Sequence, residues 1–226
     1  MVYAIILPVV ALPSWDRVTI SLTHFTIPAG TASSWDATSG ACCPGPKLKA
    51  IVAGTLTVVS EGPVRVVRAT APDRIEPFPA GREVVLTAGD TVITRNEHGD
   101  TWTNPGPEPV ELLSTPVLSG NVPGPPVPRG WIMGGADVRQ GMSLSAEAYL
   151  LRLRRMTVMT GDVVRVPPAA LLFAQTLASE PVYLARGIAG QISVFGAQDT
   201  TVALYLLTVD PVGAGAGTPL AAAAGT

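Results

Sequence analysis

Apolar and polar residues alternate along several short stretches of this chain, at the period of two that puts successive side chains on opposite faces of a β-strand. Turn signals separate these stretches, because proline fixes φ and glycine permits a positive φ. The one helix-like patch, residues 143–155, runs straight into a β-rich segment and predicts a strand with a short lead-in. Regular short strands of this kind favour an all-β barrel or sandwich. The clearest alternating stretches are residues 18–22, 64–67 and 84–93, and the turns are 28–30, 61–63, 79–81 and 104–106.

Length and composition agree with strands joined by turns. The chain has 226 residues, of which 23 are glycine and 22 proline, and only 14% are charged. It is long enough for one large all-β domain or two small ones, and a single barrel would leave residues over. The formal net charge is −2 and the basic residues are dispersed. We therefore expect no nucleic-acid partner, and the charge does not imply an acidic one.

The first 13 residues, MVYAIILPVVALP, are apolar but contain two prolines and no basic leading segment. They are also shorter than the roughly 20 residues that span a bilayer. The pattern predicts an edge strand, with no signal peptide and no membrane partner. The compartment stays open: the cytoplasm is favoured, and an exported form that has lost a leader is the alternative.

Composition suggests a division of the chain into four parts. Residues 120–135, GNVPGPPVPRGWIMGG, are poor in ladder donors and predict a linker or a surface strap. The carboxyl-terminal stretch has no bulky apolar residues to anchor it, so we expect it to be mobile and without function. The predicted parts are a first barrel at 1–118, a linker at 119–140, a second half at 141–211 and a tail at 212–226.

An internal repeat supports two related halves, but its register is open. Residues 20–30 align without gaps on residues 151–161, which places Gly30 on Gly161. A competing register places Gly161 on Gly89 instead. Both registers pair strand-like segments, so they predict the repeat equally well.

The two cysteines, Cys42 and Cys43, are adjacent in the sequence. Neither has a distant partner with which to close a stabilising loop, so a disulfide framework is excluded. They are interpreted as small loop or core residues, and metal binding through the pair is the alternative.

The segment 89–104, GDTVITRNEHGDTWTN, has the spacing of the second motif of cupin barrels. In this resemblance Gly89 and Asn104 match the motif. Asp100 stands where the motif carries its metal-binding histidine, Arg95 replaces the customary proline, and Glu97 replaces a glycine. The frame of the motif is kept while its ligand is lost.

The first cupin motif is similarly recognisable by its frame, from Gly30 to Gly54. Lys47 occupies the position of the ligand glutamate. The histidine pair would fall at Ala41 and Cys43, or at Gly40 and Cys42 in a longer spacing.

Taken together, residues 15–118 resemble a cupin domain. The resemblance implies an all-β fold: a cupin jelly-roll barrel followed by a second, degenerate or smaller cupin-like barrel. It also implies no conventional metal site and no cofactor, because a divalent transition metal needs several converging donors and a lysine would repel it. The alternative is an atypical metallocupin that uses Cys43, Asp100 and a shifted His98.

The resemblance also nominates residues for a pocket inside the first barrel. Lys47 and Asp100 come from opposing motifs, so we expect them to pair across the barrel in place of the metal. Alternatively Lys47 binds an anionic ligand, with Trp102 and Trp35 as an apolar wall. His98 and Cys43 are further candidates for the pocket. Residues two apart on a strand share a face, so His98 is expected to point into the cavity together with Asp100 and Trp102.

His24 shares a strand face with Ile20 and Leu22. It is therefore a candidate to line the barrel, and a buried, hydrogen-bonded core histidine is the favoured interpretation.

Two hypotheses about function follow. The first is a noncatalytic cupin-like protein that binds a small molecule or serves a structural role. The second is a metal-free isomerase or lyase in which His98 or His24 acts as acid or base beside Lys47 and Asp100. Cupins commonly associate through barrel edges, so a homodimer is also predicted by resemblance, with residues 2–12 covering an edge in the same chain or in a partner.

Overall fold

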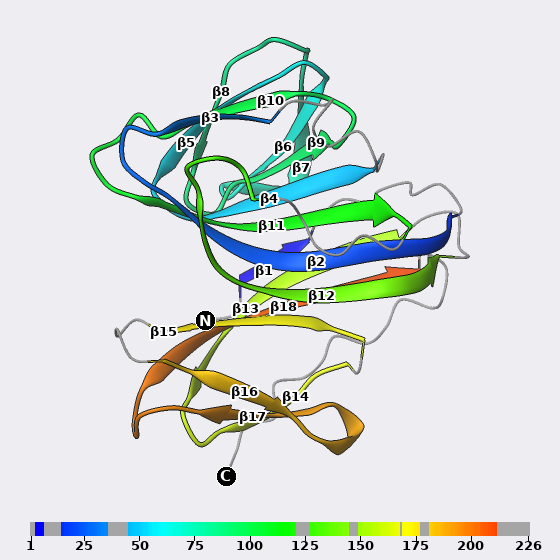
Figure 1. The fold of residues 1–226 in the computed structure, drawn as a ribbon, viewed down its shortest axis with the longest axis vertical. Helices are drawn as coiled ribbons and strands as arrows, with labels where there is room; N and C mark the ends of the chain where they lie inside the picture. The colour runs from blue at the N-terminus through cyan, green and yellow to red at the C-terminus, as the bar shows by residue number, and fades with distance from the viewer. Residues whose placement is uncertain are drawn as a thin grey trace.

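The fold of this protein is all-β. The computed structural model describes residues 3–6, 15–35, 45–120, 127–144, 149–167, 169–176 and 181–211. In this part of the chain the one helical element is a single 3-10 turn, Ile188–Gly190, and no helix is long and apolar enough to cross a membrane. The strands of the described residues form four antiparallel sheets, which lie one above another as layers (Figure 1). The predicted all-β class is confirmed.

The first two layers form a jelly roll, in which strands pair from the ends of the segment inward. Each strand therefore meets its mirror partner, and the eight strands separate into two sheets that face each other. The pairs are β2 (Trp15–Ile27) with β11 (Val110–Ser119), β3 (Ala32–Trp35) with β10 (Asp100–Thr103), β4 (Pro46–Ala53) with β9 (Thr91–Arg95), and β5 (Thr55–Ser60) with β8 (Val84–Thr87). An extra hairpin, β6 (Val64–Arg68) and β7 (Ala71–Phe78), extends the larger sheet beyond β9.

The third and fourth layers repeat the outer part of this order with fewer strands. Here β13 (Tyr149–Met159) pairs with β18 (Thr201–Pro211), and β14 (Val163–Arg165) pairs with β17 (Gln191–Phe195). Two further strands, β15 (Leu171–Thr176) and β16 (Tyr183–Arg186), lie beside β18 and β17. The second half is thus a smaller two-sheet unit. Because β13 takes the place that β2 has in the first half, the strand order agrees with the register that aligns residues 20–30 on 151–161.

The two halves exchange strands. The first strand, β1 (Tyr3–Ile6), pairs with β13 at the edge of the third layer, so the predicted edge strand is present at these residues. Conversely β12 (Ile132–Leu144) pairs with β2 and completes the sheet of the first half. The predicted linker is therefore wrong from Ile132 onward. Its prolines end at Pro128, so every later residue of the strand keeps a backbone N–H for the ladder.

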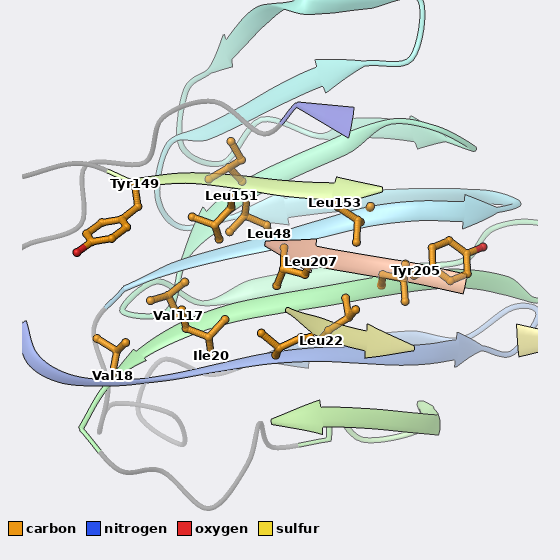
Figure 2. Packing of buried hydrophobic residues seen from close by; sticks show 14 of the residues in the cluster. Val18, Ile20, Leu22, Leu48, Val117, Tyr149, Leu151, Leu153, Tyr205 and Leu207 are labelled. Carbon is orange, nitrogen blue, oxygen red and sulfur yellow. The ribbon is translucent and has the colours of Figure 1, made fainter. Parts of the chain in front are cut away.

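Within the described part of the chain, three hydrophobic cores fill the spaces between the four layers, and alternation along single strands decides which core a side chain enters. On β4, Leu48 and Ala50 belong to the middle core, between the halves, whereas Ile51 belongs to the core inside the jelly roll. Figure 2 shows the middle core, where β2, β4 and β11 meet β13 and β18. Burying a leucine or valine of this kind contributes about 1.5–3 kcal/mol. The same alternation sends two lysines of β4 into the jelly roll.

Candidate functional site

Lys47 and Asp100 form an ion pair inside the jelly roll. Lys47 lies on β4 in the larger sheet and Asp100 on β10 in the smaller one, so the pair joins the two sheets across the core. The Lys47 Nζ–Asp100 Oδ2 distance is 2.6 Å, and the side chains are 8% and 0% exposed. The predicted ion pair between Lys47 and Asp100 is therefore present.

The neighbouring groups hold the Asp100 carboxylate mainly by one oxygen. Thr94, which faces Lys47 across the β4–β9 ladder, donates its hydroxyl to Asp100 Oδ2 at 3.2 Å. Asp100 Oδ1 is buried and has no hydrogen-bond partner among the described residues. A buried carboxylate in this arrangement depends on its cation, since the loss of one partner leaves the other charge unpaired in a core.

Lys49 is a second buried cation at this site, and the motif frames did not single it out. Its Nζ lies 4.0 Å from the centroid of the Trp102 ring, and the residue is 6% exposed. The pKa of Lys49 is lowered to about 7, mainly by burial and additionally by the charge of Lys47, while Asp100 opposes both effects. A signal was present in the sequence: the chain has two lysines, they stand two residues apart on one strand, and all other basic residues apart from the two histidines are arginines.

The residues at this site do not fit a divalent metal. Asp100 is occupied by an ammonium at hydrogen-bond distance, and Lys49 adds a second amine nearby. Transition metals need several imidazole, thiolate or carboxylate donors that converge on one point. In the described part of the chain no three histidine, cysteine, aspartate or glutamate residues gather in such a way. Cys43 lies outside the described residues.

His98 lies beside the site in sequence but in a different place in space. It belongs to the turn between β9 and β10, and its ring covers the turn after β5: a Cβ built on Gly62 would lie 2.1 Å from His98 Cδ2. The predicted common face holds for Asp100 and Trp102, which are both 2% exposed. It does not extend to His98 because β10 begins at Asp100, so strand alternation ends there. The side chain of Trp35 is outside the described part.

His24 faces the middle core rather than the interior of the jelly roll, which corrects its prediction as a lining residue of the first barrel. Even-numbered residues of β2 point toward the second half, and the His24 ring stacks on Phe173 of β15 with centroids 4.8 Å apart. Its Nε2 lies 3.7 Å from Glu111 Oε2. Burial lowers the pKa of His24, while Glu111 opposes the shift.

Comparisons with known proteins give a distant structural likeness. No family model matches the chain, and no curated protein matches it. The bacterial pirin YhhW of Escherichia coli in complex with nickel(II) is 15% identical, with a TM-score of 0.33 over 84% of this chain and 82% of that one. A second YhhW structure is 16% identical, with a TM-score of 0.30 over 83% of this chain and 79% of that one.

A protein from a second organism is similar to the same degree. AerE of Microcystis aeruginosa is 15% identical, with a TM-score of 0.33 over 85% of this chain and 88% of that one. At these values the likeness assigns this chain neither a metal nor an activity. The chain is an all-β protein whose jelly roll carries the buried Lys47–Asp100 ion pair between its two sheets.

Proposed function

We propose that this chain is a cupin-like protein that works without a metal and binds a small molecule without catalysis. The observation that carries the proposal is the direct contact of 2.6 Å between Lys47 Nζ and Asp100 Oδ2, which joins the two sheets of the jelly roll. In this proposal the ion pair takes over the structural role of a bound metal, since it ties opposite sheets together through charge. Lys49 strengthens the case because a second amine disfavours any cation at the same place.

Two variants test whether Lys47 and Asp100 form a structural ion pair or a ligand-binding site. Asp100→Ala leaves Lys47 buried without its partner and should lower the free energy of unfolding by about 3–5 kcal/mol. The double variant Lys47→Met, Asp100→Leu replaces the pair by apolar side chains of similar size and should recover most of that loss. Urea unfolding of the three proteins measures both effects.

Elemental analysis of the purified protein tests whether the chain binds a metal. We expect transition metal well below one equivalent per chain, unchanged by Asp100→Ala. About one metal per chain that disappears in Asp100→Ala would show a metal centre and overturn the proposal. Turnover of a sugar or keto acid that falls by orders of magnitude in His98→Ala would instead favour the isomerase or lyase alternative.

A further inference from the structure

A cavity of about 480 Å³ lies between the jelly roll and the second half. We call it the interlayer pocket; Ala50, Ala69, Leu113, Leu153, Arg155 and Tyr205 are among its lining residues. Its volume falls within the range of about 300–1,000 Å³ that small-molecule sites occupy. Ala69, Pro72 and Ala88 on its wall are exposed, so solvent reaches it beside the turn between β6 and β7.

The pocket forms where two facing rows of side chains, one from each sheet, do not fill the space between them. Across the third layer, Phe173, Tyr205 and Arg155 are neighbours on adjacent strands. Across the second layer, the facing row contains His24, Leu113 and then Ala50. His24 fills the space over Phe173 by stacking on it, whereas Ala50 is too small to reach across to the second half. The middle core therefore ends in a hollow on the Arg155 side. In Figure 2, Leu153 and Tyr205 lie together at one end of that core.

The walls of the pocket are mostly aliphatic, but they also contain Arg68 and Arg155, which differ in whether a carboxylate neutralises them. Arg68 is neutralised, with its Nε 3.1 Å from Glu76 and one terminal nitrogen 2.8 Å from Asp90. Arg155 has no carboxylate within 4.0 Å in the part of the chain that the structure describes, and its buried Nε has no hydrogen-bond partner there. A partly buried guanidinium without a counter-ion is costly, and it presents donors in a fork that matches a carboxylate.

Tyr205 adds a neutral donor at the same end of the pocket. The Arg155 guanidinium carbon lies 6.0 Å from the centroid of its ring. Burial raises the pKa of Tyr205 despite the opposing charge of Arg155, so the hydroxyl keeps its proton at neutral pH. The Glu111 carboxylate, whose charge also raises the pKa of Tyr205, is hydrogen-bonded to another residue, since Gln175 Nε2 donates to it at 2.8 Å.

We infer that the interlayer pocket binds a small monocarboxylate with an apolar body, whose carboxylate meets Arg155 and Tyr205 and whose hydrocarbon part lies against Leu113 and Leu153. The inference rests on the proposed small-molecule binding function and names its site and ligand class. Binding between the halves, rather than inside the jelly roll, leaves the Lys47–Asp100 pair intact. The ligand would also bridge the two halves, because Leu113 belongs to the sheet of the first half and Arg155, Tyr205 and Leu153 belong to the sheet of the second.

The test uses the full chain and two probes of matched shape, 3-phenylpropionate and its neutral analogue 3-phenylpropanamide, in calorimetric titrations. We expect the carboxylate to bind and the amide to bind at least about 10-fold more weakly, because only the carboxylate forms charge-assisted hydrogen bonds. Arg155→Met should weaken carboxylate binding by about 10-fold or more and leave amide binding unchanged. Arg154→Met is the matched control, since Arg154 neighbours Arg155 on β13 and points to the opposite face.

A filling variant tests the cavity itself. Ala50→Leu adds a side chain to the wall and should abolish binding of both probes, while a thermal unfolding curve verifies that the protein is folded. Equal affinity for carboxylate and amide, wild-type affinity in Arg155→Met, or no binding of 3-phenylpropionate would each overturn the inference. These outcomes are independent of the metal content and of the Asp100 variants, so failure of the pocket and failure of the metal-free proposal can be told apart.

Discussion

At the scale of single residues, Lys47, Lys49 and Asp100 are ionisable side chains buried in the apolar interior of the jelly roll. Lys47 and Asp100 neutralise each other at 2.6 Å, while Lys49 rests on the face of Trp102 with no carboxylate within 4.0 Å among the described residues. The lowered pKa of Lys49 follows, because burial disfavours its charged form and Lys47 repels it. A cation over an indole ring is nonetheless attracted to it, which explains why the amine tolerates this place.

Nuclear magnetic resonance can detect this residue directly, since the chain has only two lysines. With lysine labelled at the ε-carbon, the spectrum should contain two side-chain signals, and Lys49→Met assigns them. We expect the Lys49 signal to titrate near pH 7 and to be displaced by the ring current of Trp102. A Lys49 signal that stays unchanged between about pH 6 and pH 9 would contradict the burial of this amine.

Stability should depend on pH through the same residue. The pKa of Lys49 is about 7 in the folded protein and 10.5 in its ordinary state, so between these values the unfolded chain binds more protons. The free energy of unfolding should therefore rise with pH across this window, by at most about 1.4 kcal/mol per pH unit from this group. Urea unfolding at several pH values should show the slope in the wild type, and the slope should shrink in Lys49→Met.

At the scale of elements, a glycine pair in β12 makes room for the His24–Phe173 stack. The register of β12 on β2 shifts between Met133 and Gly135, as in a β-bulge. A Cβ built on Gly134 would lie 2.5 Å from His24 Nδ1. The histidine cannot swing away freely because Phe173 covers its ring at 4.8 Å. The strand thus uses glycine for close approach and not for a turn.

Gly134→Ala should accordingly destabilise the protein, by about 1–3 kcal/mol, through overpacking against the His24 ring. Gly187→Ala is the control, because its added Cβ would meet only ordinary contacts, the nearest at 3.5 Å. Thermal or urea unfolding compares the two variants. Equal stability of both would mean that His24 has another position to occupy.

At the scale of the whole molecule, strand exchange joins the halves. β1 precedes the first half in sequence but pairs with β13 of the second half, and β12 follows the first half but pairs with β2. Each half is therefore completed by a strand that lies outside its own stretch of sequence. The middle core then buries one face of each half against the other. We expect the two halves to unfold together for this reason, although their sequences divide plainly at the proline-rich stretch.

Removal of residues 1–12 tests the role of the exchanged strand. Loss of β1 exposes the edge of β13, whose unpaired backbone groups are a template for pairing with another chain. Light scattering should show more self-association in the truncated protein than in the intact one. If the intact chain is itself a dimer that becomes a monomer on truncation, β1 contributes to the dimer interface instead.

The sequence by itself determined the all-β class and indicated the residues of the central ion pair. Alternation has a period of two, so it is visible locally, and the resemblance around Gly54 and Gly89 led to the prediction that Lys47 and Asp100 pair, which the structure shows. Only the tertiary structure decided that Lys49 faces Trp102, that His24 belongs to the middle core, that β12 is a strand and that Arg155 ends in a pocket. These features depend on which distant strands become neighbours. Pairing of that kind is fixed by contacts across the whole chain, and no local pattern of residues records it.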